Sequence, residues 1–173
     1  MGALRGLTDS SLIPFTGSEI TYEMAKPALF CHNMAKIEEF EDAINENCLN
    51  EKDELNLHCM EHEIINGMVR RTLFIPKGMF VTGRIHKEPY IDMVIWGDVE
   101  VQVQTGTERY DQFTILEGIP GRKRVLYAHA DTLWTTVDRT TAKSLDEVED
   151  NITFGKFCEY NEYRMGLTAG EVK

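Results

Sequence analysis

The sequence predicts a mainly β protein, a single domain built around eight short strands that form a sandwich or a jelly-roll barrel. Between residues 57 and 138, β-prone runs recur at intervals of roughly ten residues, with Gly, Pro, Asn and Asp turn signals between them. No helical pattern alternates with these runs, which disfavours a parallel α/β sheet. With 173 residues, the chain is long enough for one ordinary hydrophobic core.

The strongest local signal is Asn66-Gly67, which lies between two β-prone runs and predicts a hairpin, because both turn positions need positive φ angles. In 99–104, Val alternates strictly with Glu or Gln, as expected of a half-buried strand. The predicted strands are 58–65, 68–75, 79–86, 90–97, 99–104, 112–116, 122–128 and 132–137. The longer turns are expected at 105–111, 117–121 and 129–131.

The part of the chain before the barrel, residues 1–56, divides into two pieces. Residues 1–33 scatter apolar side chains among Gly, Pro, Ser and Thr without a sustained period. We expect an extended arm there, which wraps its own barrel or lies on a neighbouring subunit. In 34–48, apolar residues recur every three or four positions, which predicts an amphipathic helix with Asn33 as its N-cap.

The part after the barrel, residues 139–173, is predicted to be a helix followed by an aromatic tail. Ser144 and Glu147 have the spacing of a capping box, and aromatic residues follow Gly155. We expect the arm and the tail to contact other subunits, because they hold apolar side chains outside the barrel. These interface residues are Leu12, Ile13, Phe15, Tyr22, Phe30, Phe157, Tyr160 and Tyr163.

Composition narrows the function classes. The formal net charge is −11, which disfavours nucleic-acid binding, since phosphate recognition needs a cationic surface. No run of about 18 apolar residues predicts a membrane span. Four cysteines occur without a Cys-x-x-Cys pair, so we expect reduced thiols in a cytosolic setting.

Three blocks carry a resemblance to a known family: FIPKGMFVTGRIHK (74–87), PGRKRVLYAHADTLWTTV (120–137) and SLDEVED (144–150). They are similar to the cupin superfamily, and most similar to small RmlC-like cupins encoded by tailed bacteriophages. The resemblance spans about Glu61 to Val137. It implies a single cupin-type jelly-roll barrel at 57–138, with an N-terminal arm, one N-terminal helix and a short helical tail.

Metal-binding cupins supply His-x-His and a later Glu from a first motif, and a further His after a Pro-x-Gly turn. On that pattern His86 falls on the first histidine, Glu88 on the second and Asp92 on the carboxylate, and Gly97 closes the turn. Arg124 takes the place of the last histidine, where a cation would repel a metal ion and pair with a carboxylate. We therefore expect no metal and no cofactor.

The resemblance also leaves a catalytic interpretation open. Metal-free sugar epimerases of this fold use a histidine base, an acid that orients it and a tyrosine, roles that His86, Asp92 and Tyr127 would take. Whichever function holds, we expect five residues to line the barrel pocket. They are His86, Glu88, Asp92, Arg124 and Tyr127.

Two functional hypotheses follow. The preferred one is a non-enzymatic structural protein of a bacteriophage virion, assembled in the bacterial host cytoplasm. Its barrel would form a homo-oligomer and join other virion subunits, as a decoration, neck or tail component. The alternative is a soluble phage-encoded protein for a small molecule, either a metal-free sugar epimerase or isomerase or a binder of sugars or nucleotides. An inhibitor of a host defence protein also fits an acidic phage protein.

Overall fold

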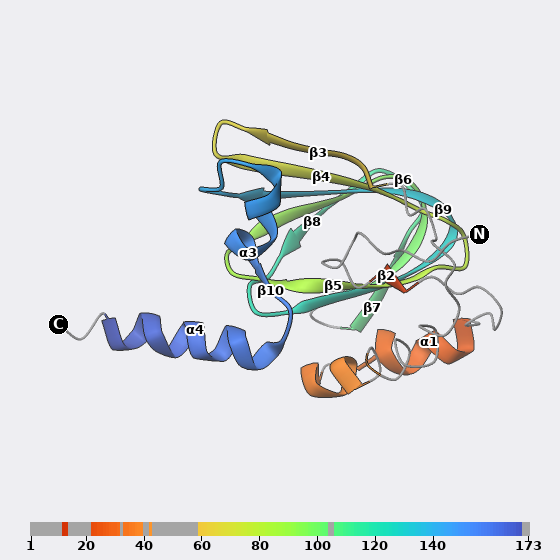
Figure 1. The fold of residues 1–173 in the computed structure, drawn as a ribbon. Helices are drawn as coiled ribbons and strands as arrows, with labels where there is room; N and C mark the ends of the chain where they lie inside the picture. The colour runs from red at the N-terminus through yellow and green to blue at the C-terminus, as the bar shows by residue number, and fades with distance from the viewer. Residues whose placement is uncertain are drawn as a thin grey trace.

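The computed structural model describes residues 12–13, 22–31, 33–39, 42, 59–103 and 106–170, and the fold is given for these residues. The described chain is mainly β, as predicted. Its strands form one sheet that curls into a half-barrel of the jelly-roll kind (Figure 1). The strands are β2 (Leu12–Ile13), β3 (Cys59–Ile65), β4 (Met68–Ile75), β5 (Phe80–His86), β6 (Tyr90–Val103), β7 (Gly106–Tyr110), β8 (Thr114–Gly118), β9 (Lys123–Arg139) and β10 (Thr153–Phe154).

Two long strands, β6 and β9, pair with each other and give the sheet its curvature. The first half of β6 pairs with β8, and its second half pairs with β7. In the same way, one end of β9 pairs with β5 and the other with β4. Each long strand therefore belongs to both halves of the barrel.

Three sequence predictions are wrong because of these long strands. The expected turn at 129–131 lies inside β9, the expected turn at 105–111 contains β7, and the runs 90–97 and 99–104 are one strand. The physical reason is a bend in β6 at Gly97, whose φ is 122° and whose pairing with β9 shifts on either side. A Cβ on Gly97 would lie 2.4 Å from the Thr132 hydroxyl oxygen, so only glycine allows this close approach.

The hairpin between β3 and β4 is confirmed. Asn66 has a φ of 50° and Gly67 a φ of 77°, the pair of positive values that the sequence predicted for a two-residue turn. The backbone pairs Ile65 with Met68 directly across this turn.

Helices pack on the curled sheet at two places. Helix α1 (Tyr22–Leu29) packs against β5 and β9, where it buries Ala25 and Leu29 against Phe80 and Val125. The 3₁₀ helix η1 (Leu145–Glu147) and helix α3 (Val148–Ile152) close the opposite side against β4. Helix α4 (Phe157–Gly170) then extends away from the barrel, as Figure 1 shows.

The helix predictions hold in part. Residues 34–39 are helical, and the Asn33 side chain accepts hydrogen bonds from the backbone N–H groups of Ala35 and Lys36, as an N-cap should. Residues 43–48 of that predicted helix lie outside the described residues, as does Phe15.

Helix α1 was not predicted, and the capping box that the sequence predicted at Ser144 and Glu147 is incomplete. Ser144 makes no side-chain cap bond, while the Glu147 carboxylate accepts from the Lys143 N–H.

Candidate functional site

A cavity of about 320 Å³ lies inside the curled sheet, between β4, β5, β6 and β9, and is closed by η1 and α3. One wall is apolar and includes Leu73, Ile75, Val81, Leu126 and Trp134. The other wall is polar. Its members are His62, Arg71, Arg84, His86, Tyr90, Asp92, Arg124, Thr136 and Glu149.

The centre of the polar wall is His86, at the end of β5. Its Nδ1 lies 2.5 Å from Oδ1 of Asp138 on β9, and both side chains are buried. The ring stacks on Tyr90, the first residue of β6, with 3.6 Å between the ring centroids. A carboxylate on Nδ1 and a stacked ring on one face fix the orientation of the imidazole.

Burial raises the pKa of Tyr90 well above its ordinary value, so this hydroxyl keeps its proton at neutral pH.

A second polar group surrounds Asp92 on β6. Its Oδ1 accepts hydrogen bonds from Trp134 Nε1 at 3.1 Å and from the Thr136 hydroxyl at 2.7 Å, and its Oδ2 accepts one from Arg124 Nε at 3.1 Å. Arg124 also donates to the backbone carbonyls of Gln102 and Glu117. Asp92 is therefore saturated by fixed donors, and its role here is to hold the cavity wall.

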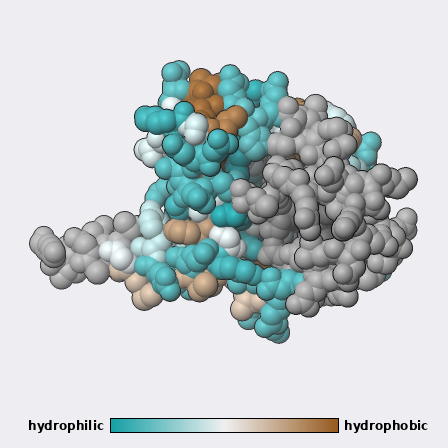
Figure 2. Space-filling model, in the orientation of Figure 1, coloured by the Kyte–Doolittle hydropathy of each residue, from teal (hydrophilic) through white to brown (hydrophobic). Residues whose placement is uncertain are grey.

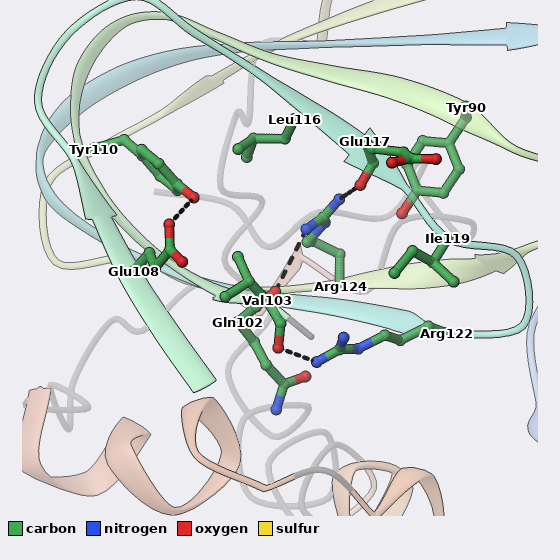
Figure 3. A pocket seen from close by; sticks show the side chains of 10 residues that line it. All are labelled: Tyr90, Gln102, Val103, Glu108, Tyr110, Leu116, Glu117, Ile119, Arg122 and Arg124. Atoms are coloured by element: carbon green, nitrogen blue, oxygen red, sulfur yellow. Dashed lines mark hydrogen bonds between the residues drawn. The ribbon is translucent and has the colours of Figure 1, made fainter. Parts of the chain in front are cut away.

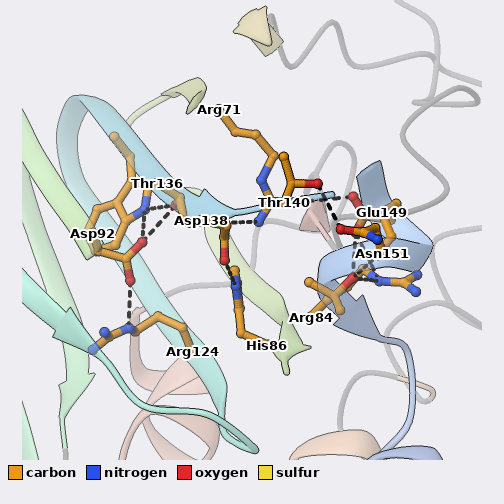
Figure 4. Close-up of polar contacts among 12 residues, drawn as sticks. Arg71, Arg84, His86, Asp92, Arg124, Thr136, Asp138, Thr140, Glu149 and Asn151 are labelled. Carbon is orange, nitrogen blue, oxygen red and sulfur yellow. Dashed lines mark hydrogen bonds and ion pairs between the residues drawn. The ribbon is translucent and has the colours of Figure 1, made fainter. Parts of the chain in front are cut away.

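A third group ties the covering helix to the sheet (Figure 4). Glu149 on α3 accepts from Arg71 Nη1 at 3.2 Å, and its other oxygen lies 2.9 Å from Arg84 Nε. Arg71 also reaches Asp138 at 3.3 Å, which links this group to His86. In Figure 4 these side chains form a continuous polar row between β9 and α3.

The structure brings only part of the predicted pocket together. His86, Asp92 and Arg124 line the cavity, and Arg124 pairs with Asp92 as expected. Glu88 does not line it, because it lies in the exposed loop between β5 and β6, where its carboxylate is 3.4 Å from the Tyr163 hydroxyl.

Tyr127 is the second correction. Leu126 faces the cavity, so its neighbour Tyr127 faces the other side of β9, where it packs beneath α1. The proposed triad of His86, Asp92 and Tyr127 is therefore not assembled.

His129 lies on that side too, 3.0 Å from the Glu100 carboxylate, with the ring of Tyr22 centred 5.0 Å away. Burial and the Glu100 carboxylate raise the pKa of Tyr22 to about 12.

Sequence reasoning missed Tyr90, Arg84 and Asp138. Arg84 could have been found from spacing, because it lies two residues before His86 on one predicted strand and so shares its face. Asp138 follows His86 by 52 residues and has no local signal.

These residues do not fit a metal ion. Arg84 and Arg124 line the same cavity, and guanidinium groups repel a cation and cannot coordinate it. Within the described part of the chain, no group of three or more His, Cys, Asp or Glu side chains is arranged to hold a metal.

A second hollow of about 310 Å³ lies beside the first, towards β7 and β8 (Figure 3). Tyr90 and Arg124 line both hollows and stand between them. On this side Arg122 donates to the carbonyl of Val103, and Tyr110 donates to Glu108 at 2.7 Å.

The predicted interface residues lie in several settings. Leu12 and Ile13 form β2, which pairs with β5 of the same chain. Tyr22 packs on its own barrel, whereas Phe30 is exposed. The aromatic residues of α4 cluster around Phe154, with the rings of Phe154 and Tyr163 centred 5.4 Å apart. Phe157 and Tyr160 on α4 also belong to this aromatic cluster. None of the described helices has the length and apolar character needed to cross a membrane.

Comparisons with known proteins give fold likenesses only. No family model matches the chain, and no curated protein matches it. Among solved structures, a cupin-2 domain protein from Shewanella frigidimarina is 7% identical, with a TM-score of 0.39 over 46% of this chain and 80% of its own. Ectoine synthase from P. lautus is 15% identical, with a TM-score of 0.37 over 45% of this chain and 60% of its own.

A putative ethanolamine utilization protein from Salmonella typhimurium is 13% identical, with a TM-score of 0.39 over 45% of this chain and 65% of its own. The structures that this chain resembles are thus cupin and double-stranded β-helix domains of varied or unknown function.

Proposed function

We propose that the protein binds a small, uncharged polar molecule inside the barrel, without a metal ion, and that a monosaccharide-like compound is the best fit. The observation that supports this is the cavity of about 320 Å³ inside the curled sheet, with His86 held in its wall by Asp138 and Tyr90. Ligand pockets typically start near ~300 Å³ and combine apolar walls with a few fixed polar groups.

The charges of the wall favour an uncharged ligand. Arg71 and Arg84 are paired with Glu149, and Arg124 is paired with Asp92. A phosphate or carboxylate would have to compete with these buried ion pairs, so nucleotides are a poorer fit than sugars. The apolar wall suits the C–H faces of a sugar ring, and His86 and Tyr90 suit its hydroxyl groups.

The same geometry fits the epimerase or isomerase form of this proposal. An imidazole that is oriented by a carboxylate at Nδ1 can exchange a proton with a ligand through its other nitrogen. Tyr90 keeps its proton at neutral pH and is the matching donor. Asp138 and Tyr90 thus replace Asp92 and Tyr127 as the candidate partners of His86.

The test is ligand binding to the full chain. Thermal shift and calorimetry with neutral monosaccharides, sugar phosphates and nucleotides should give a response to neutral sugars, which His86→Ala removes. His129→Ala is the matched control, because His129 is also paired with a buried carboxylate but lies on the other face of the sheet. Absence of any response in wild type, or loss of binding in both variants, would reject the proposal.

A role as a bacteriophage structural protein is the second candidate, and helix α4 is the feature that favours it. This helix extends from the barrel in Figure 1, and Met165 on it is 63% exposed. A projecting helix of this kind is suited to contact another virion subunit. Mass spectrometry of purified particles should then find this chain in fixed stoichiometry, and removal of 157–173 should prevent its incorporation.

Deletion of 1–33 is a less clean test of that role. It would remove α1, whose Ala25 and Leu29 are fully buried against the barrel, so it would damage the fold as well as any interface. A truncation within α4 leaves the core clusters of the described residues intact. Absence of the chain from particles would remove the structural candidate and leave the binding proposal unaffected.

A further inference from the structure

The side of the sheet that faces away from the cavity carries an apolar surface on β9, β6 and β8. Side chains alternate along a strand, so the neighbours of cavity-lining residues point to the opposite face. The register places Ile91 beside Val137 and Met93 beside Ile115 on this face. We call this surface the outer sheet face. Its main apolar members are Ile91, Met93, Trp96, Phe113, Ile115 and Val137.

Four of these side chains are strongly exposed. Ile91 is 47% exposed, Trp96 46%, Phe113 59% and Ile115 60%. For side chains of these sizes the fractions correspond to roughly 500 Å² of apolar surface in one region, which is near the upper end for a protein that stays monomeric. Ile65 and Met68 on either side of the β3–β4 turn are 43% and 46% exposed, and Figure 2 shows a hydrophobic group at this end of the molecule.

The charges on this face sit at its edge and neutralise one another. Arg70 on β4 lies 2.7 Å from Glu61 and 3.1 Å from Glu63, both on β3. Beside the apolar residues themselves lie Glu117 on β8, Glu88 and Arg139, so both signs of charge border them. Two copies of this acidic chain can therefore meet on the outer sheet face without placing many like charges together. The same face offers no electrostatic attraction to an anionic membrane or to a nucleic acid.

The shape of the face is self-complementary. At one end it has a depression of about 630 Å³, lined by apolar Met68, Pro89, Ile91 and Val137 and by charged Glu88, Glu117, Asp138 and Arg139. On β8 and just before it, Ile115 and Phe113 are the most exposed side chains of the face. In a two-fold pair, the protruding end of one copy can fill the depression of the other, and the reverse.

We infer that the outer sheet face binds a second copy of this chain and forms a two-fold dimer. A standard interface takes about 800 Å² from each partner. The exposed apolar side chains of the outer sheet face supply most of that area, and the hairpin residues Ile65 and Met68 extend it. This surface differs from the arm and tail that the sequence indicated as interfaces, and it leaves the cavity on the opposite side of the sheet free.

Sedimentation velocity of the full chain from about 1 to 100 µM tests the inference, because interfaces of this size give association in that range or below. Wild type should sediment as a dimer. Ile115→Glu should raise the dissociation constant at least tenfold. Met165→Glu is the matched control, since it adds the same charge at a site of equal exposure on α4, 63% against 60%, and should leave the dimer unchanged.

Circular dichroism melts of the variants check folding, and Ile91→Glu repeats the test on a second strand should Ile115→Glu prove unstable. A wild-type chain that stays monomeric over the whole range overturns the inference. So does a dimer that survives both substitutions on the outer sheet face, or one that Met165→Glu dissociates as well.

Discussion

Two histidine–carboxylate pairs lie on opposite faces of the same sheet. His86 and Asp138 are 2.5 Å apart and face the cavity, and His129 and Glu100 are 3.0 Å apart beneath α1. Both pairs are largely buried and both have a tyrosine beside them, Tyr90 in one case and Tyr22 in the other. The chemical groups are nearly the same.

The two pairs differ in the surroundings of the histidine ring, on the side that does not contact the carboxylate. His86 borders a cavity large enough for a ligand, while His129 is packed between the rings of Tyr22 and Tyr127, whose centroids are 5.0 and 5.1 Å from its own. A buried histidine with an acid partner is therefore no sign of a reactive site by itself. Position on the cavity side of the sheet decides its role.

The largest effect expected concerns the carboxylates. Asp138→Ala should lower the free energy of unfolding by about 3 kcal/mol, because it leaves buried Arg71 with one carboxylate fewer and His86 without its partner. Glu100→Ala should cost less, about 1 kcal/mol, since its partners are a histidine and the Tyr22 hydroxyl. Urea unfolding of both variants measures the difference, and equal losses would contradict it.

A smaller effect should come from Tyr22→Ala. This substitution removes the ring that packs on Tyr127 and His129, so we expect a loss of about 1–2 kcal/mol. Amide hydrogen exchange should accelerate over α1, while ligand binding in the cavity stays unchanged. Weakened binding in Tyr22→Ala would show that the two faces are coupled.

The fold was predictable where the signals are local. Asn66-Gly67 identified the first hairpin because two adjacent residues with positive φ have few other uses, and β4 has the predicted bounds. The extent of β6 and β9 was not predictable, because Gly97 and the His-Ala-Asp stretch at 129–131 resemble turn signals while the ladder between the two strands continues past them.

The candidate site was predictable only in part. His86 and Arg124 came from the family pattern, but Tyr127 could have been excluded, because residues three apart on a strand face opposite sides and Arg124 faces the cavity. Asp138 joins His86 only through the pairing of β5, β9 and β4, which no short stretch of sequence contains.

The smallest effect expected is a pH dependence due to His62, which lines the same cavity. Burial, aided by the nearby Arg71 guanidinium, lowers the pKa of His62 from its ordinary value of 6.5. Below about pH 6.5 the unfolded chain then binds a proton more readily than the folded one, so His62 lowers stability as the pH falls. His62→Gln should flatten the decline between pH 7 and 5.5 in urea titrations, and an unchanged slope would count against this assignment.

The most direct test of the central claim is the side-chain nitrogen NMR spectrum of the histidines during titration with a neutral sugar that gives a thermal shift. The account predicts that the ring signals of His86 move with saturation while those of His129 stay in place. A titration that moves His129 and leaves His86 unchanged, or moves neither, would contradict it.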